Sequence, residues 1–332
     1  MKKKLIQSVL VKGEGYAPIL VACTLARFVI PDPLKIEVLS TQLKSDVGSL
    51  FLKSDMDQLH RSLGIAQSHM QRISKNKTPI AAVQLSENLR LPFWDYGAPL
   101  KGVPFYHIWL REHLNGGVKD LRSFNPSFAP VHRDAGYWEI DPSKYEELLR
   151  SISAHAGIGK IYSDVEQVSC DEQDLIIETQ GGPIRQQLTD CLRLGNGRFP
   201  TVSITNFDLM VMQRNLLALV QNFPQIGSKK IERQELEEEL NSVLASVEDM
   251  QFLMSADFDT GKLSERVKYR IELWLDVGRV IPCEGDLFLP HEWLAVLHKR
   301  VGPPMAYSRL VDSISRQEAS AHLQKYQIDE GI

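Results

Sequence analysis

A glycine-rich turn near the start of the chain separates two predicted elements of regular structure. The apolar run 5–11 predicts a buried strand, and the segment from Pro18 to Phe28 predicts a helix with proline in its first turn. Residues 34–39 predict a second strand. A strand, a helix and a strand in this order form a crossover unit, so the start of the chain predicts a Rossmann-like α/β domain.

The turn itself has part of the pattern of a dinucleotide site. Gly13 would form a tight turn, and Gly15 would let the backbone approach phosphate closely. Ala17, two residues after Gly15, belongs to the same predicted site. The third glycine position is Pro18, and the second strand ends in Ser40 where an acid would bind ribose. Two interpretations stay open: the turn binds a nucleotide, or it only connects a strand to a helix.

Composition describes an ordinary globular chain. The 332 residues suffice for one large or two closely joined domains, with 43% hydrophobic and 24% charged residues. A net charge of −4 gives no electrostatic reason to expect nucleic acid or an anionic membrane as a partner. The longest apolar stretches are shorter than a membrane span, and the lysine-rich start lacks a persuasive cleavage site. We therefore expect a cytoplasmic protein.

Neither the cysteines nor the histidines have the spacing of a metal site. The four cysteines lie far apart, and Cys23 falls in the first predicted helix, where we expect it to be a buried hydrophobic residue. No histidine pair shows the i, i+4 spacing of two ligands on one helical face, so no metal is expected. The histidines considered are His107, His113, His291 and His298, and His132-Arg133-Asp134 predicts a turn or, alternatively, an acid or base near a pocket.

Further helices and strands follow along the chain. Residues 50–65 have helical spacing, and Asp141 or Ser143 can cap a helix over 144–156. The aromatic-rich segment 94–138 predicts an irregular excursion, which forms either a lid or substrate wall or part of the core. Strands are expected at 159–162, 163–168, 175–179 and 188–194, and helices at 209–223, 231–258 and 263–277.

These elements predict two parts of the chain. Residues 1–205 would form the Rossmann-like dinucleotide-binding domain, with an irregular aromatic-rich insertion at about 86–138, and residues 206–332 a helical C-terminal region packed on it. In the charged run 232–239 we expect a solvated helix face, with the apolar residues of that helix turned inward. A basic partner for this run is the alternative.

The order of short motifs along nearly the whole chain resembles the flavin-dependent tryptophan halogenase family. No single motif is specific, and the common order carries the resemblance. The motifs are Gly13-x-Gly15, Leu63-Gly64-Ile65, Tyr137-Trp138-Glu139-Ile140-Asp141, Gly157-Ile158, Leu194-Gly195-Asn196-Gly197, Phe223-Pro224, the run Phe288 to Leu297 with Trp293 within it, and Gly302-x-Pro304.

The resemblance implies a fold and a cofactor. It implies an FAD/NAD(P)-binding fold of the flavin-monooxygenase type with a largely helical C-terminal region. FAD is the implied cofactor, and loss of its binding is the alternative. Its contacts would come from the first turn and from the later loop: Gly13, Gly15, Ala17, Ser40, Gly195, Asn196 and Gly197.

The chain departs from the family at the residues that carry out chemistry. The family's lysine would fall near Thr78 to Ile80, where the sequence has lysine only at Lys75 and Lys77. The W-x-W motif is absent, and the stretch between Cys191 and Gly195, where the family has a long insert, is short. We therefore expect no catalytic residue of the family type.

Three hypotheses follow from these departures. The first is a degenerate member, a pseudoenzyme that acts as a binding or regulatory module and takes a small aromatic ligand. The second is an active FAD-dependent halogenase or monooxygenase acting on an indole or other aromatic substrate, with a flavin reductase as its partner. The third is a subunit that pairs with a full-length halogenase relative through an exposed apolar surface.

Overall fold

A computed structural model describes the chain in fifteen stretches, which fall into two compact units. Unit 1 comprises residues 1–78 and 138–244, and unit 2 comprises residues 79–137 and 245–332. The division predicted at residue 205 stays a prediction. The stretches described are 6, 8–29, 34–41, 48–56, 58–86, 89–117, 120–124, 136–158, 161–162, 165–171, 174–179, 182–187, 207–223, 230–254 and 263–327.

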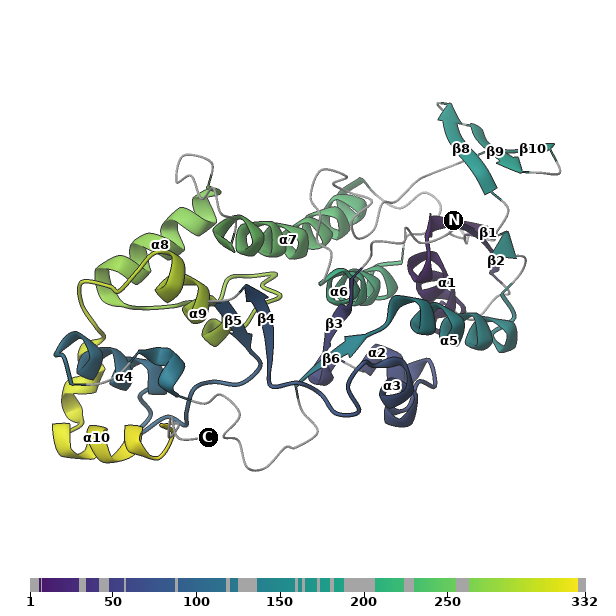
Figure 1. The fold of residues 1–332 in the computed structure, drawn as a ribbon. Helices are drawn as coiled ribbons and strands as arrows, with labels where there is room; N and C mark the ends of the chain where they lie inside the picture. The colour runs from purple at the N-terminus through teal and green to yellow at the C-terminus, as the bar shows by residue number, and fades with distance from the viewer. Residues whose placement is uncertain are drawn as a thin grey trace. The chain divides into compact units, whose positions relative to one another are not determined.

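A parallel sheet forms the start of unit 1. Strand β1 (Ser8–Glu14) pairs in parallel with β2 (Lys35–Thr41), which pairs in parallel with β7 (Ile161–Tyr162). Helix α1 (Tyr16–Phe28) connects β1 to β2 and packs on both strands and on helix α5 (Pro142–His155), as Figure 1 shows. The predicted crossover unit is therefore confirmed.

Two of the predicted details in this unit are confirmed at the level of side chains. Cys23 is 1% exposed on the inner face of α1. Asp141 caps α5, because its carboxylate accepts hydrogen bonds from the backbone N–H groups of Ser143 and Lys144. A proline at the first position of α5 loses no hydrogen bond there.

The predicted helix over residues 50–65 is wrong in its first half. Residues Leu50–Lys53 form strand β3, which pairs with β6 (Tyr137–Ile140), and all four are buried. A short apolar run buried on both faces has no alternation to separate a strand from a helix. A 3₁₀ turn η1 (Ser54–Met56) and the short helices α2 (Gln58–Ser62) and α3 (Gln67–Ile73) follow.

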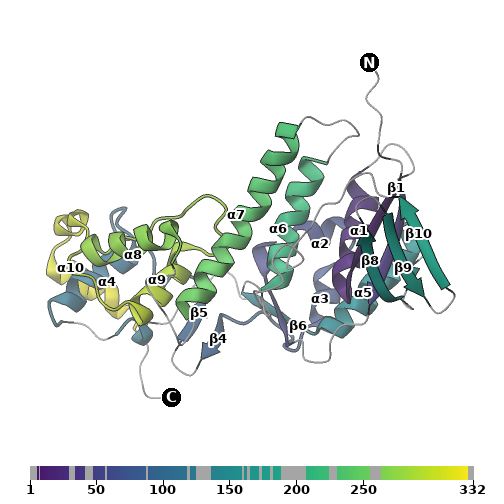
Figure 2. The same ribbon diagram turned by 90° about the horizontal axis from the view of Figure 1, so that it is seen from above.

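The remaining elements that the structure describes in unit 1 are an antiparallel meander and two helices. Strands β8 (Val165–Asp171), β9 (Asp174–Thr179) and β10 (Gly182–Gln187) pair in chain order. Helix α6 (Asp208–Gln221) packs on β3 and α1, and the first part of α7 (Lys230–Met254) lies beside α6 in Figure 2. The strand expected at 188–194 lies outside the described residues.

The apolar positions predicted to turn inward in α7 are confirmed. They are Leu236, Leu240, Val243 and Leu244, and none is more than 5% exposed. Of the acidic residues of the run that the structure describes, Glu235, Glu238 and Glu239 are exposed and Glu237 is half-buried. This is the pattern of a helix with one solvated face.

Unit 2 is a small hairpin surrounded by helices. Strands β4 (Ala82–Ser86) and β5 (Leu89–Pro92) pair antiparallel, and α9 (Pro290–Arg300) packs on β5. Helix α4 (Phe105–Leu114), in the segment predicted to be irregular, packs against α10 (Arg316–Gln324) (Figure 1). The remaining elements are η2 (Leu121–Ser123), α8 (Glu265–Val277) and η5 (Arg309–Ser313).

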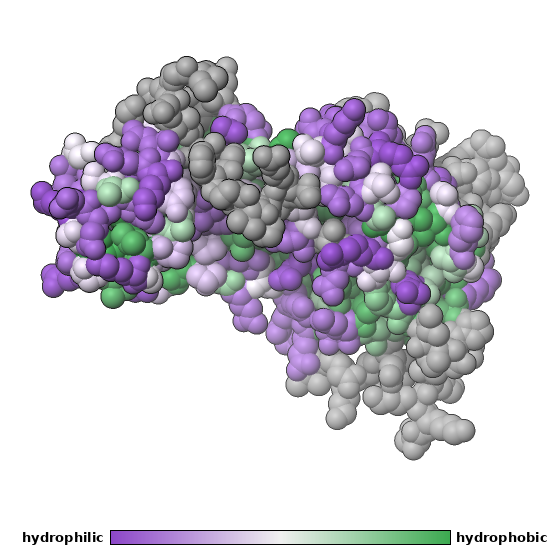
Figure 3. All heavy atoms as spheres, turned by 90° about the horizontal axis from the view of Figure 1, so that it is seen from below, coloured by the Kyte–Doolittle hydropathy of each residue, from purple (hydrophilic) through white to green (hydrophobic). Residues whose placement is uncertain are grey.

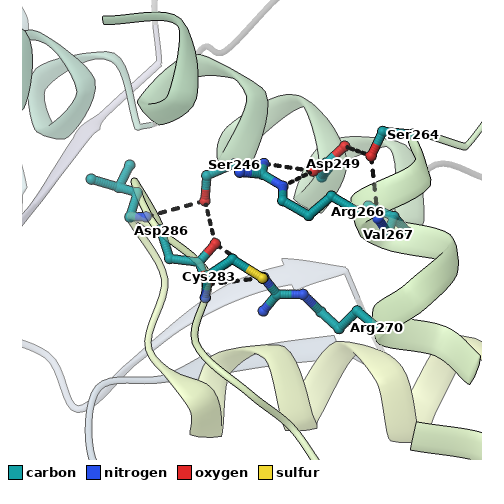
Figure 4. Close-up of polar contacts among 9 residues, drawn as sticks. Ser246, Asp249, Ser264, Arg266, Val267, Arg270, Cys283 and Asp286 are labelled. Carbon is teal, nitrogen blue, oxygen red and sulfur yellow. Dashed lines mark hydrogen bonds and ion pairs between the residues drawn. The ribbon is translucent and has the colours of Figure 1, made fainter. Parts of the chain in front are cut away.

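Charged residues hold the helices of unit 2 together (Figure 4). The Arg270 guanidinium, 1% exposed, donates to Asp286 at 2.9 Å. It also lies over the ring of Trp293, 4.0 Å from its centroid. The same carboxylate accepts hydrogen bonds from the Ser246 hydroxyl and the Cys283 backbone N–H. The network therefore joins α7, α8 and the loop before α9.

The face drawn in Figure 3 is mostly hydrophilic where the structure describes it, with smaller hydrophobic areas between. Among the described residues, two large hydrophobic side chains of unit 2 are more than half exposed besides Tyr269: Met305 at 78% and Leu310 at 67%. None of the helices described has the length and apolar character needed to cross a membrane.

Candidate functional site

The glycine turn between β1 and α1 has the backbone conformation that the sequence predicts. Gly15 is the residue before the first turn of α1, with φ 57° and ψ −130°, a combination that side-chain-bearing residues rarely adopt. No side chain caps the helix, and its first turn has no acid. This end of α1 therefore has the positive end of a helix dipole without a side-chain anion on α1 itself.

The residues beside Gly15 limit the donors at this helix end. The first three positions of α1 are Tyr16, Ala17 and Pro18, and proline has no N–H to offer. Gly15 and Tyr16 are buried, while Ala17 is half-buried.

Ser40, predicted to contact the ribose, lies inside the turn. It is 1% exposed, and its hydroxyl donates to the backbone carbonyl of Gly15 at 3.1 Å. It lies opposite Gly13 in the register of β1 and β2. The other predicted cofactor contacts, Gly195, Asn196 and Gly197, lie outside the described residues. Of the seven predicted site residues, the four that the structure describes, Gly13, Gly15, Ala17 and Ser40, lie together at this turn.

A chain of buried polar side chains runs inward from the turn. The ring of Tyr16 lies 5.4 Å from that of Tyr145, centroid to centroid, and the Tyr145 hydroxyl lies 2.6 Å from His60 Nε2. The other imidazole nitrogen of His60, Nδ1, accepts a hydrogen bond from the Gln213 amide. Burial lowers the pKa of His60 to about 4, so its imidazole is neutral and Nε2 donates to Tyr145.

Asp208 extends this polar region at the start of α6. Burial raises the pKa of its carboxyl group to about 7. Burial also raises the pKa of Tyr16, and the charge of Asp208 adds to that rise. No sequence motif predicts this cluster, because its members come from α1, α2, α5 and α6.

The two lysines considered as displaced catalytic residues are surface residues. Lys77 is exposed, and Lys75 is about half-exposed, with its ammonium 3.6 Å from Glu139 Oε1. The Ser49 hydroxyl and the Asn76 amide also donate to the Glu139 carboxylate, at 2.7 and 3.0 Å. This arrangement is a surface ion pair within a hydrogen-bonded turn.

The five aromatic residues between 94 and 109 divide into two groups in unit 2. Phe105 and Trp109 are fully buried and Tyr96 is 7% exposed, so the core-packing interpretation holds for these three. Trp94 and Tyr106 are only half-buried. The half-buried pair is therefore the part of the set that a ligand can reach.

An acid and an imidazole accompany the half-buried aromatic residues. Asp95, next to Trp94, is exposed and accepts a hydrogen bond from the backbone N–H of Tyr96 at 2.8 Å. Desolvation by the surrounding atoms raises the pKa of Asp95, and the charge of His291 lowers it. His291 donates from Nε2 to the Phe93 carbonyl at 3.0 Å, which fixes its ring. An accessible carboxylate, imidazole and indole thus belong to one part of unit 2.

The histidines of unit 2 do not make a metal site among the residues that the structure describes. His113 stacks on Trp109 with 4.9 Å between ring centroids, and His298 lies 3.9 Å from Asp120. Burial lowers the pKa of His107 to about 4. No group of three metal-binding side chains occurs within the described stretches, and residues 132–134 lie outside them.

The fold of this chain is similar to that of flavin-dependent halogenases. No protein-family model matches the sequence, and no similar protein was found among the curated ones. BrvH, a flavin-dependent halogenase from Brevundimonas sp. BAL3, matches with a TM-score of 0.77 and 14% identity over 97% of this chain and 95% of that chain.

Two further solved structures agree with this match. Xcc4156, a flavin-dependent halogenase from Xanthomonas campestris, has a TM-score of 0.75 at 15% identity, over 97% of this chain and 94% of that one. The tryptophan 6-halogenase SttH from Streptomyces toxytricini has a TM-score of 0.69 at 12% identity, over 96% of this chain and 95% of that one. The chain therefore has the α/β fold of the flavin-dependent halogenases, and the resemblance found in the sequence is confirmed as a likeness of fold.

The residues at the glycine turn do not match the donors and acceptors that a dinucleotide needs in such a fold. The ribose acid is absent, and the serine in its place is buried and donates to Gly15. Pro18 removes one N–H from the helix end, and the exposed carboxylate of Glu14 lies between the two glycines. The chemistry of the turn thus disagrees with the cofactor that the fold implies.

Proposed function

We propose that this protein is a halogenase-like binding or regulatory module without halogenation chemistry, and that it takes a small aromatic ligand in unit 2. The observation that carries the proposal is the environment of Lys75. A lysine that handles a reactive species must reach it in a site closed to water, whereas Lys75 is about half-exposed and paired with Glu139.

The ligand would bind beside Trp94 and Asp95. An indole face that is only half-buried can stack on an aromatic ring, and the neighbouring carboxylate and imidazole can accept or donate hydrogen bonds at the ring's polar group. Tyr106 is half-buried in the same segment. These are the residues through which a small aromatic molecule would be recognised.

A product assay tests the absence of halogenation. The protein would be incubated with a flavin reductase, FAD, chloride or bromide, and a panel of indoles, with SttH as the positive control, and products would be read by mass spectrometry. We expect no halogenated product from this protein. A halide-dependent product that requires reduced flavin would overturn the proposal.

A fluorescence titration tests the ligand site. Small aromatic molecules whose absorption and emission do not overlap those of tryptophan would be titrated against the native protein, Trp94→Phe and Trp274→Phe. Trp274 is fully buried and donates to the Gly302 carbonyl, so its variant is the matched control. Saturable binding lost only in Trp94→Phe supports the site, and equal binding by all three proteins contradicts it.

One observation favours a second candidate, a subunit that pairs with a halogenase relative. Met305 and Leu310 are large hydrophobic residues with most of their surface exposed. The Met305 backbone N–H donates to the Leu275 carbonyl, so this side chain lies beside the end of α8, where Val277 is also exposed. Co-purification with such a relative that Met305→Ser abolishes would support this candidate.

A further inference from the structure

The glycine turn of unit 1 is held in its conformation by contacts within the chain. We infer that this turn is a structural joint which holds β1, α1 and β2 together and does not bind FAD. The inference goes beyond the proposed function, because a binding module without halogenation chemistry can keep or lose the flavin.

The packing of Gly13 accounts for that glycine without a ligand. A Cβ atom added at Gly13 would lie 3.1 Å from Cδ of Pro18, closer than ordinary contacts. In the dinucleotide fingerprint a third glycine lets the helix pack closely on the strand. Here the proline ring fills this space against Gly13, so the close approach of strand and helix is made by the chain itself.

Ser40 accounts for the conformation of Gly15. Its hydroxyl donates to the Gly15 carbonyl at 3.1 Å in a region from which water is excluded, since Ser40 is 1% exposed. A buried carbonyl that loses such a bond is costly, so the serine stabilises the glycine in its rare backbone conformation. A ribose hydroxyl would compete for the same side chain.

Tyr16, the residue after Gly15, is held in place by other helices of unit 1. Tyr16 is 5% exposed and packs on Tyr145, which is joined through His60 to Gln213. The start of α1 is thus anchored in the core of unit 1 through three other helices. A turn fixed on both sides does not depend on a cofactor for its shape.

Charge also disfavours phosphate at this turn. Glu14 is exposed and stands between Gly13 and Gly15, where the phosphates of a dinucleotide would approach the backbone. A carboxylate there repels an anion. With Pro18 lacking an N–H, the helix end has fewer donors with which to offset that repulsion.

The test is flavin binding by the full chain. The protein would be purified with FAD in all buffers, and its absorbance spectrum recorded after removal of free flavin. Its melting temperature would then be followed in FAD up to the solubility limit, because a ligand that binds the folded state raises that temperature. We expect no flavin band and no rise. A stoichiometric flavin band, or a saturable rise, would overturn the inference.

Variants test the structural role of the serine. Ser40→Ala is expected to lower the melting temperature by about 2–4 °C, the effect of losing one buried hydrogen bond in a unit of this size, equally with and without FAD. The matched control is Ser62→Ala, whose exposed hydroxyl donates to the Gln58 carbonyl, and which should leave the melting temperature unchanged. An unchanged melting temperature in Ser40→Ala would contradict the inference that this serine stabilises the turn.

The failure of this inference differs from that of the proposed function. Bound flavin without any halogenated product would overturn the inference and leave the proposed function standing. A halogenated product would overturn the proposed function, and with bound flavin it would overturn both.

Discussion

The two compact units stabilise their buried polar groups in different ways. The buried polar chain of unit 1 consists of neutral groups, the phenols of Tyr16 and Tyr145 with the His60 imidazole and the Gln213 amide. Unit 2 uses charges, above all the buried pair of Arg270 and Asp286 (Figure 4). Neutral groups with displaced pKa values make stability depend on pH, whereas an ion pair makes it depend on both partners being present.

This difference predicts which single substitutions lower the free energy of unfolding most. Arg270→Met should lower the free energy of unfolding by about 3–5 kcal/mol, because it leaves the Asp286 carboxylate buried without its counter-charge. Urea denaturation followed by tryptophan fluorescence would measure this, since Trp94, Trp109, Trp274 and Trp293 all belong to unit 2.

The control for that prediction lies on the same helix. Lys268 pairs with Glu265 at 2.7 Å at the surface, so Lys268→Met should change the free energy by at most about 1 kcal/mol. If the two variants are equally stable, the buried pair contributes no more to the free energy of unfolding than the surface pair does.

In unit 1 the corresponding change should be smaller. Tyr145→Phe keeps the ring and removes the acceptor of the His60 N–H, and leaving that donor unsatisfied costs about 1–3 kcal/mol. Circular dichroism during urea denaturation would measure the effect, with Tyr269→Phe, at a tyrosine 54% exposed, as the control. A Tyr145→Phe variant as stable as the control would show that the polar chain contributes nothing.

One part of the pH dependence of stability should come from Asp208 in unit 1. The pKa of Asp208 is about 7 in the folded protein against an ordinary 3.8, so the stability it contributes is complete below about pH 4 and is lost as the pH rises through 7. Asp208→Asn should therefore match the native melting temperature near about pH 4 and exceed it increasingly up to about pH 8.

His60 acts in the opposite sense, since its folded pKa of about 4 means that its contribution is lost as the pH falls from 6.5 through 4. Because both proteins keep His60, the difference between their melting curves isolates Asp208. A difference that stays constant over the whole pH range would rule out this explanation.

The smallest effect on stability is expected at the accessible acid of unit 2. Asp95 is exposed, so Asp95→Asn should change the free energy of unfolding by no more than about 0.5 kcal/mol while weakening the binding of a ligand beside Trp94. Thermal melting and ligand titration of the same variant separate the two roles. A large loss of stability would mean that Asp95 serves to accept the hydrogen bond from the Tyr96 backbone N–H, and not to bind a ligand.

Local patterns were enough to predict the elements that have a clear periodicity or a cap. The crossover unit around α1, the Asp141 cap of α5 and the inward face of α7 all follow from residues within a few positions of one another. The prediction failed at β3, where four buried residues in succession look the same in a strand and in a helix. Helix α4 was missed because prolines and glycines surround it.

The candidate site was predicted only where it is contiguous in sequence. Gly13, Gly15, Ala17 and Ser40 were expected to face a cofactor, and three of these four occur within five residues. The pairs of Tyr145 with His60 and of Asp95 with His291 join residues 85 and 196 positions apart. Separations of this size leave no trace in a single sequence, because only packing brings the groups together.

The sequence by itself determined the fold class and the glycine turn. It also determined that the family's ribose-binding acid is absent and that no lysine stands at the position of the family's lysine. All of these depend only on which residues are present. Tertiary structure alone decided how Ser40 is used, since its hydroxyl faces the Gly15 carbonyl. It also decided that Lys75 is paired at the surface and that His60 is neutral, because solvent exposure and the nearest partner set both.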